Sequence, residues 1–540
     1  MDAKENAQGE LELGLPLELG PGRKPAAAAG EVKRGRVRLK AIDRKQSCWR
    51  TVVVEDLLPA DHLARAIWEL VGQLDLSRYY APIRAVAGVP GREHLDPRLM
   101  ISLWILGYSE GIGSARELAR RCEYQPAFQW LCGLEGVSYH ALSSFRVDHG
   151  EELQALFVNH LAVLSSEGLI ELSEVMHDGT KIRAQASAGS FRRSGTLQEH
   201  RQAAQQRVEE LAAEAEAGGD GGATPVSARQ QAARARAVRE KQERMEQALA
   251  ELAEVQAAHP PARRDGVRIS ETEPEARIMK QPDGGFGPSY NVQISTTARD
   301  KIIVGIAATQ SGGDPPELVP AVTRIKAVFQ QKPGAMVVDG GFATRGNVVA
   351  LAAQEIELVG ALIDHAAPAE KGLARRGVTP EYYPSQFAYQ AETNTFICPR
   401  GQVLTPQRRV AVPGATVHYY RAKAGDCRAC PARLSCLGPR KKNGRGRSLT
   451  RRVEDAAVLA YRARMETEAA QALYARRSEV AEFPHLWFKE KLGLRKFSLR
   501  GRAKAELEAL WAALTYNLQQ WFRLRWLPRQ TAPPPAAAHG

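Results

Sequence analysis

The spacing of apolar residues divides the chain into a helical first part and a mixed second part. Between residues 54 and 164, apolar residues recur at helical intervals. Asp96 followed by Pro97 marks one helix start, because Asp accepts a backbone hydrogen bond at the N-cap and Pro fits the first turn. The pattern predicts an all-helical N-terminal domain over residues 46–165.

From residue 169 onward, short apolar runs replace the helical period. The run LIELSEVMHDGTKI predicts a buried strand that ends in a turn at Asp178 and Gly179. Further strands are predicted at 290–296, 302–309, 335–339 and 356–362, and helices at 316–331 and 347–354. Strands in succession, followed by strands that alternate with helices, predict a mixed α/β sheet.

Composition marks two insertions and two tails around that sheet. Ala, Arg, Glu and Gln dominate a segment that GGDGGATP interrupts, which favours a helical hairpin, with a solvated or partly disordered arm as the alternative. The predicted domains are a disordered tail 1–45, a helical DNA-binding domain 46–165, core segments 166–195, 263–375 and 466–527, a helical hairpin 196–262, a cysteine-bearing basic insertion 376–465 and a disordered tail 528–540.

Composition and charge narrow the class of protein. The 540 residues have ordinary hydrophobic and charged fractions, 44% and 25%, which excludes wholesale disorder. Lys and Arg exceed Asp and Glu by 74 − 61 = 13, which favours a polyanionic partner, with nucleic acid first and acidic membrane second. No apolar run reaches about 18 residues, and no signal peptide is visible, so we expect no membrane span and a cytoplasmic location.

Two aspartates are candidates for catalysis. Asp178 and Asp339 each end an apolar run and precede a glycine. The carboxyl ends of strands in an open sheet are where ligands and metals bind, and two carboxylates there can share a divalent cation. Asp-Gly is also ordinary turn chemistry, so each pattern alone is a weak signal.

A third carboxylate is expected in the late helical segment, which offers Glu479, Glu482 and Glu490. Lys489 follows Glu482 by seven residues, two helical turns, and therefore shares its face. A carboxylate with a lysine beside it suits a scissile phosphate and its neighbour. Pro484 marks a helix start or a kink, and a start there would weaken the same-face argument.

Several motifs occur in one order along the chain. They are a segment at 79–122, DGTKI at 178–182, ARIMKQPDGGFGPSYNVQI at 276–294, VVDGGF at 337–342 and a segment at 474–501. With these motifs the chain resembles the DDE transposases of bacterial insertion sequences, in the branch with a helical N-terminal domain and a cysteine-bearing insertion. Phe342 departs from the family's usual tyrosine, and SETEPEAR replaces a more aspartate-rich segment.

The resemblance implies an RNase H-like mixed five-stranded sheet flanked by helices. It implies a catalytic triad of Asp178, Asp339 and Glu482 with Lys489 beside it. Two Mg²⁺ (or Mn²⁺) ions would be bridged by Asp178, with Asp339 and Glu482 each completing one site. One ion would activate water to cut the element's 3′ end, and the freed 3′-hydroxyl would attack target DNA.

The expected partners are therefore double-stranded DNA, at the element's terminal inverted repeats and in the target, and further copies of the chain in a homodimer or higher oligomer. The expected location is the nucleoid of a bacterial cytoplasm. No phosphate-binding loop is visible, so no nucleotide cofactor is expected. The alternatives are an RNase H-like nuclease that cuts without joining, and a catalytically idle DNA-binding protein descended from a transposase.

Four of the seven cysteines form two clusters. Cys398 begins CPRG, and Cys427, Cys430 and Cys436 follow as C-x-x-C-x₅-C. Four thiols in two clusters could bind one structural Zn²⁺, as in a small ribbon, but the unequal spacing leaves free or redox-sensitive thiols equally open, with a disulfide as a weaker alternative.

Basic residues are candidates for DNA contact in three places. The N-terminal helices either read DNA or serve as a dimerisation scaffold, and a basic run at 439–452 and the segment after the third motif favour phosphate contact over solvated charge. The candidates are Arg116, Arg120, Arg121, Arg146, Arg440, Lys441, Lys442, Arg445, Arg447, Lys489, Arg495 and Arg500.

Overall fold

The computed structural model describes residues 44–47, 49, 51–85, 93–217, 225–362, 366–439 and 444–531. Every described helix and strand lies within Val53–Gly540. Apart from 44–45 and 528–531, the predicted tails lie outside the described residues. The tail prediction is wrong for 528–531, because these residues belong to helix α20 (Leu527–Thr531).

The helical pattern predicted for the N-terminal part is confirmed. Its helices are α1 (Leu63–Gln73), α2 (Ser77–Tyr80), α3 (Pro97–Ser109), α4 (Ala115–Tyr124), α5 (Pro126–Cys132), α6 (Tyr139–Asp148) and α7 (Gly150–Ser166). Asp96 caps α3 by accepting a hydrogen bond from the backbone of Arg98, with Pro97 in the first turn. No helix in the described part of the chain has the length and apolar character needed to cross a membrane.

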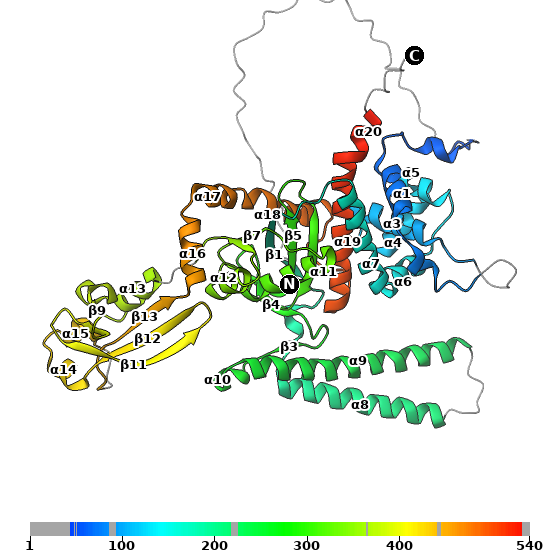
Figure 1. Cartoon of the computed structure of the whole chain (residues 1–540). Helices are drawn as coiled ribbons and strands as arrows, with labels where there is room; N and C mark the ends of the chain where they lie inside the picture. The colour runs from blue at the N-terminus through cyan, green and yellow to red at the C-terminus, as the bar shows by residue number, and fades with distance from the viewer. Residues whose placement is uncertain are drawn as a thin grey trace, which may run out of the picture. The chain divides into compact units, whose positions relative to one another are not determined.

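The central sheet is mixed, as predicted (Figure 1). Its strands are β1 (Glu174–Arg183), β4 (Arg277–Lys280), β5 (Phe286–Thr297), β6 (Ile303–Thr309), β7 (Ala335–Val338) and β8 (Glu357–Val359). Their order is β4-β5-β1-β7-β8, and β6 also pairs with β5. β5 is antiparallel to β1, β4 and β6, while β7 is parallel to both β1 and β8. The sheet has six strands rather than the expected five, because the short β4 also pairs with β5.

The turn expected at Asp178 and Gly179 does not exist. β1 continues through both residues and pairs with β5 along its whole length from Val175 to Arg183. The parallel pairing with β7 ends at His177, opposite Val338. The carboxylate of Asp178 therefore lies where the pairing of β1 with β7 ends and its pairing with β5 continues.

Helix α19 (Arg502–Trp521) joins the sheet to the N-terminal helices. It contacts β6 on one side and α3 and α7 on the other. Tyr108 of α3 stacks on Trp511 of α19 with ring centroids 6.4 Å apart. One cluster of buried residues, which includes residues from Leu58 to Trp526, contains both the N-terminal helices and strands of the sheet, so these two parts share an interior.

The remaining helices complete the second part of the chain. They are α11 (Leu318–Phe329), α12 (Arg345–Ala352), α13 (Ala366–Ala374), α16 (Ala456–Met465), α17 (Glu468–Ala475) and α18 (Arg477–Leu486). α18 continues into a π-helical turn, η6 (Trp487–Lys491).

The first insertion is the helical hairpin that the sequence predicts, α8 (Ser194–Ala217) and α9 (Pro225–Ala258), followed by α10 (Pro261–Arg264) and closed at its base by the pair β2 (Phe191–Arg192) and β3 (Ile269–Ser270). A thin apolar seam holds it, in which Leu197, Met245 and Leu252 are buried.

The second insertion is an antiparallel sheet that the sequence did not predict. It contains β9 (Ala388–Gln390), β10 (Thr395–Ile397), β11 (Val403–Val412), β12 (Ala415–Ala422) and β13 (Ser448–Glu454) in the order β13-β12-β11-β10-β9, with the short helices α14 (Ala424–Ala429) and α15 (Arg433–Leu437).

Candidate active site

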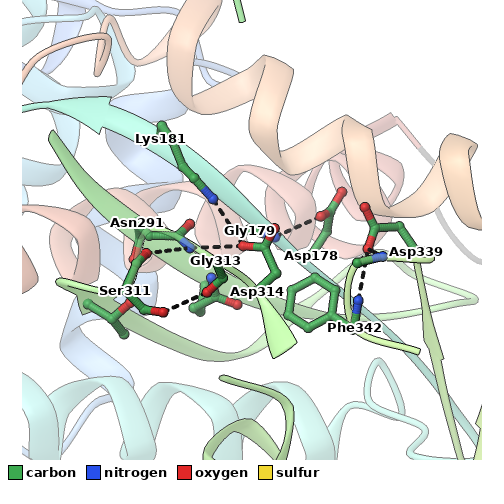
Figure 2. A network of polar contacts seen from close by, with 12 residues as sticks. Asp178, Gly179, Lys181, Asn291, Ser311, Gly313, Asp314, Asp339 and Phe342 are labelled. Carbon is green, nitrogen blue, oxygen red and sulfur yellow. Dashed lines mark hydrogen bonds and ion pairs between the residues drawn. The ribbon is translucent and has the colours of Figure 1, made fainter. Parts of the chain in front are cut away.

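Strand register brings Asp178 and Asp339 together. The parallel pairing of β1 and β7 ends at His177 opposite Val338, and each aspartate is the next residue along the chain. Adjacent strands lie about 4.8 Å apart, so the two side chains are neighbours. Figure 2 shows both carboxylates at this edge of the sheet. The structure thus places the two residues next to each other, and their joint binding of a divalent cation stays a prediction.

Asp178 lies in an environment that disfavours its charge. Burial is the largest cause of a pKa raised to about 6, and the carboxylates of Asp339 and Asp314 act in the same direction. The Gly179 N–H, which donates to Asp178 Oδ1 at 2.7 Å, and Arg477 act in the opposite direction. Asp339 accepts a 2.8 Å hydrogen bond from the backbone of Gly341. Asp178 is therefore largely charged at neutral pH, but at an electrostatic cost that a nearby cation would relieve.

A third acid, Asp314, lies beside Asp178. Its Oδ1 accepts hydrogen bonds from Lys181 Nζ at 3.0 Å and Asn291 Nδ2 at 2.9 Å (Figure 2). A Cβ at Gly179 would lie 3.0 Å from that same oxygen and 2.5 Å from Gln293 Nε2. Any larger residue at position 179 would therefore require these side chains to shift. Local sequence patterns carry no signal for Asp314, because it stands between Gly-Gly and Pro-Pro, where Asp is common in turns.

Helix α18 faces Asp178 with two basic side chains. Arg477 Nη1 lies 3.6 Å and His485 Nδ1 4.0 Å from Asp178 Oδ2. Burial, together with the charges of Lys489 and Arg477, lowers the pKa of His485 to about 3, so its ring is neutral at physiological pH. The helix begins at Arg477 and continues through Pro484. Of the two possibilities given for Pro484, the helix start is therefore wrong. Neither Arg477 nor His485 was among the residues predicted from the sequence.

The third predicted carboxylate is not joined to the other two. Glu482 is exposed on α18, and within the described residues it forms no ion pair. Its two alternatives are engaged elsewhere, Glu479 with Lys301 at 2.8 Å and Glu490 with Arg495. Glu482 is thus the unengaged glutamate of the three.

Lys489 lies half-buried on η6. Burial and then Arg495 lower its pKa, while the charge of Asp178 raises it, so its ammonium group is within electrostatic reach of Asp178. The role of Lys489 beside the two aspartates stays a prediction.

The two aspartates fit a divalent cation, although the described residues contain no group of three or more His, Cys, Asp or Glu side chains already arranged to hold a metal ion. Their oxygen atoms are the ligands that Mg²⁺ prefers, and the raised pKa of Asp178 reflects burial and repulsion that such an ion would offset. The sequence predicts Glu482 as the third ligand, and that role stays a prediction.

Two of the candidate DNA-binding arginines are buried and cannot contact DNA in this structure. Arg146 donates to the carbonyl of Gly113 at 2.7 Å, lies over the Trp104 ring and is 3.6 Å from Glu508. Arg447 is buried in the second insertion. Burial of arginine requires partners of this kind, which the sequence does not show.

The other candidates are exposed, paired or outside the described residues. Arg116 and Arg120 are exposed on α4, and Arg121 pairs with Glu117 at 2.8 Å. Arg445, Arg495 and Arg500 are also exposed. The candidates Arg440, Lys441 and Lys442 lie outside the described residues.

Comparisons with known proteins bear on both parts of the chain. A family model described as "Transposase domain (DUF772)" matches residues 52–148, and one described as "Transposase DDE domain" matches residues 397–522. The second match includes Glu482 and Lys489, whereas both aspartates lie outside it. Searches of curated proteins and of solved structures gave no match.

Proposed function

We propose that this chain, a DDE transposase of the insertion-sequence type, cuts the 3′ ends of its element and joins them to target DNA. The observation that carries the proposal is the placement of Asp178 and Asp339 at neighbouring positions of the parallel strands β1 and β7. Two carboxylates at such an edge are suited to phosphodiester chemistry assisted by divalent ions.

Strand order supports an RNase H-like core. Leaving out the short β4, the order is β6-β5-β1-β7-β8, in which the first three strands in sequence are antiparallel and the next two are parallel to β1. This is the arrangement expected of that fold. It places the first and fourth of these strands side by side, and these are the strands that position the aspartates.

We assign Asp178, Asp339 and Glu482 as ligands of two Mg²⁺ (or Mn²⁺) ions. When bound, such ions activate the attacking oxygen and stabilise the leaving one. The residues of the chain then have separate tasks. The carboxylates hold positive charge at the scissile phosphate, and Lys489 supplies a donor for a phosphate oxygen beside it.

The His485 ring lies near Asp178 and is neutral, so it adds no positive charge beside that carboxylate. Gly179 leaves no side chain between the carboxylate and the Asp314 network.

For DNA binding, we propose the exposed arginines Arg116 and Arg120, with Arg121, for the element's ends. Arg445, Arg495 and Arg500 are proposed to contact phosphates near the catalytic residues. We also propose that two or more copies act together on DNA. Because phosphate contacts release counterions, affinity should fall steeply with salt concentration.

The test is an assay of cutting and joining on a duplex that carries the terminal inverted repeat. Asp178→Asn and Asp339→Asn should each abolish both steps in Mg²⁺ while DNA affinity changes little, because they remove metal ligands and not phosphate contacts. Asp283→Asn is the matched control, since Asp283 is an exposed aspartate on the β4–β5 turn. Retained cutting in either variant would refute the assignment, and cutting without joining in the native chain would indicate a nuclease.

A further inference from the structure

The cysteine-bearing insertion encloses a small cavity that the proposed chemistry does not use. Its volume is about 30 Å³, close to that of a single water molecule. All four clustered cysteines, Cys398, Cys427, Cys430 and Cys436, line it together with Arg447. All four are free thiols. The four thiols therefore surround a space that is large enough for a metal ion.

Two of these sulfur atoms accept hydrogen bonds from backbone amides. The Gln402 N–H donates to Cys398 Sγ at 3.2 Å, and the Arg447 N–H donates to Cys427 Sγ at 3.3 Å. The first bond depends on a tight turn in which Gly401 has φ +77° and its N–H donates to the Cys398 carbonyl at 2.8 Å. Amides directed at sulfur stabilise a thiolate more than a thiol.

Arg447 adds an unbalanced positive charge to the same place. Its side chain is 6% exposed and donates to the carbonyls of Cys436 and Tyr382, both at 2.9 Å. Its Nε has no partner, and within the described residues no carboxylate pairs with it. A buried guanidinium is costly unless negative charge lies nearby. Four thiolates on one Zn²⁺ carry a net charge of about −2, which would supply it.

The sheet around the cavity has little apolar interior to hold it. Its buried core is Phe387, Leu404, Tyr420, Ala422 and Leu449. Along β11, residues 405–411 are all exposed. Small units with cores of this size usually need a metal or disulfides for stability.

We propose that Cys398, Cys427, Cys430 and Cys436 bind one structural Zn²⁺ as a tetrahedral tetrathiolate site. Binding replaces four S–H bonds by four Zn–S bonds and releases four protons to solvent, with no change of oxidation state. The four thiols, all among the described residues, are not yet at ligand geometry, and they turn about their Cα–Cβ bonds to reach the ion. The site is independent of the proposed catalysis and contains none of its residues.

The experiment measures metal in the full-length chain, purified without chelators under reducing conditions. Elemental analysis should find about one zinc per chain. The double variant Cys427→Ser/Cys430→Ser should lose it, while Cys122→Ala/Cys132→Ala, which removes two thiols from α4 and α5, should retain it. Replacement by Co²⁺ should give the visible spectrum of a tetrahedral thiolate site.

A second measurement covers the case in which the double variant does not fold. Titration of the native chain with a mercurial that displaces thiolate ligands should release zinc to a colorimetric indicator and lower the melting temperature. The proposal fails if the native chain holds no zinc, if the double variant keeps it, or if peptide mapping finds a disulfide among these four residues. Since the readout is metal content, loss of DNA cutting would not affect the result.

Discussion

Asp178 lies near charged side chains of both signs. Asp339 and Asp314 oppose its ionisation, and Arg477 on α18 favours it. The same helix carries Glu482 one turn from His485. Arg477 of α18 therefore supplies positive charge to Asp178, and we expect the same helix to supply the third carboxylate through Glu482.

Glu482 is predicted to be essential, whereas its neighbours are not. Glu482→Gln should abolish cutting because it removes a metal ligand, while Glu479→Gln and Glu490→Gln remove only the ion pairs with Lys301 and Arg495. Exposed pairs of this kind contribute about 0–1 kcal/mol, so both control variants should stay active. The measurement is the cutting rate in Mg²⁺ at equal DNA occupancy. An active Glu482→Gln together with an inactive neighbour would transfer the role to that neighbour.

Asp314 is predicted to position the site without being a ligand. Asp314→Asn keeps the shape of the side chain but weakens its hold on Lys181. Changes behind metal ligands typically cost about 10–100-fold in metal affinity or activity. We expect a loss of that size in the cutting rate, together with a higher Mg²⁺ concentration at half-maximal rate. Unchanged Mg²⁺ dependence would show that Asp314 serves only the fold.

Sequence patterns pointed to the two aspartates because strand–Asp–Gly is a local signal, and the resemblance pointed to Glu482; these assignments stay predictions. Sequence patterns could not find Asp314, Arg477 or His485, whose roles follow from which side chains lie opposite one another. The buried positions of Arg146 and Arg447 were missed for the same reason. The local sequence around an arginine does not show whether its side chain contacts water, a phosphate or a carbonyl group distant in the chain.

At the scale of elements, Glu454 joins the second insertion to the core. It lies at the end of β13 and pairs with Arg345 of α12 and Arg462 of α16, both at 2.7 Å. These hydrogen bonds, Arg462 first, lower its pKa to about 2. A carboxylate whose pKa is lowered by folding stabilises the folded chain at pH values above its unfolded-state pKa of 4.5. This stabilisation is lost as the pH falls toward the folded-state pKa of about 2.

Glu454→Gln should therefore lower the melting temperature at neutral pH, by an amount equivalent to about 2 kcal/mol. The difference from the native chain should shrink as the pH falls from 4.5 toward 2. Thermal unfolding over this range measures it, with Glu392→Gln as control, since Glu392 is exposed on the β9–β10 turn of the same insertion. A difference independent of pH would rule out the ion pairs as its source.

The sheet of the second insertion escaped prediction for a physical reason. Strands are recognised by alternation of apolar and polar residues, which arises when one face is buried. β11 exposes nearly all its residues, and its sequence, VLTPQRRVAV, has no such alternation. The central strands β1, β5, β6, β7 and β8 contain buried runs and were predicted, whereas the short β4, with a single buried residue, was not. β1 was ended too early because Asp-Gly favours a turn.

At the scale of the whole molecule, α19 makes the helical part and the sheet depend on each other. Arg146 of α6 lies 3.6 Å from Glu508 of α19, and both are buried. Glu508 also accepts hydrogen bonds from the backbone of Ser498 and Leu499. A chain that begins near residue 165 would lack the helices α3 and α7, which pack against α19, and would expose Trp511 and its neighbours. We therefore expect it to aggregate, measured by size-exclusion chromatography.

Arg146→Met tests this contact in the full-length chain. It leaves the carboxylate of Glu508 buried without its cation, which typically costs about 3–5 kcal/mol. We expect a clearly lower melting temperature, whereas Arg120→Met, at an exposed position of α4, should change it little. Equal stability of the two variants would mean that the buried pair contributes nothing net.

Because we expect deletion to disrupt the fold, recognition of the element's ends is better tested by surface substitution. Arg116 and Arg120 are one helical turn apart on α4, both exposed, so they can reach the same stretch of DNA. Arg116 also lies over the Tyr139 ring, 5.2 Å from its centroid, which fixes its direction. If they read bases, each contributes about 1–3 kcal/mol of discrimination.

Arg116→Ala/Arg120→Ala should therefore reduce the preference for end-containing over random DNA by roughly 10-fold or more. Arg234→Ala/Arg239→Ala removes the same charge from the exposed hairpin helix α9 and should weaken binding to both DNAs alike. The measurement is the ratio of the two dissociation constants at one salt concentration. An equal ratio in both variants would assign the N-terminal arginines to phosphate contact alone, and base recognition would then have to come from another surface.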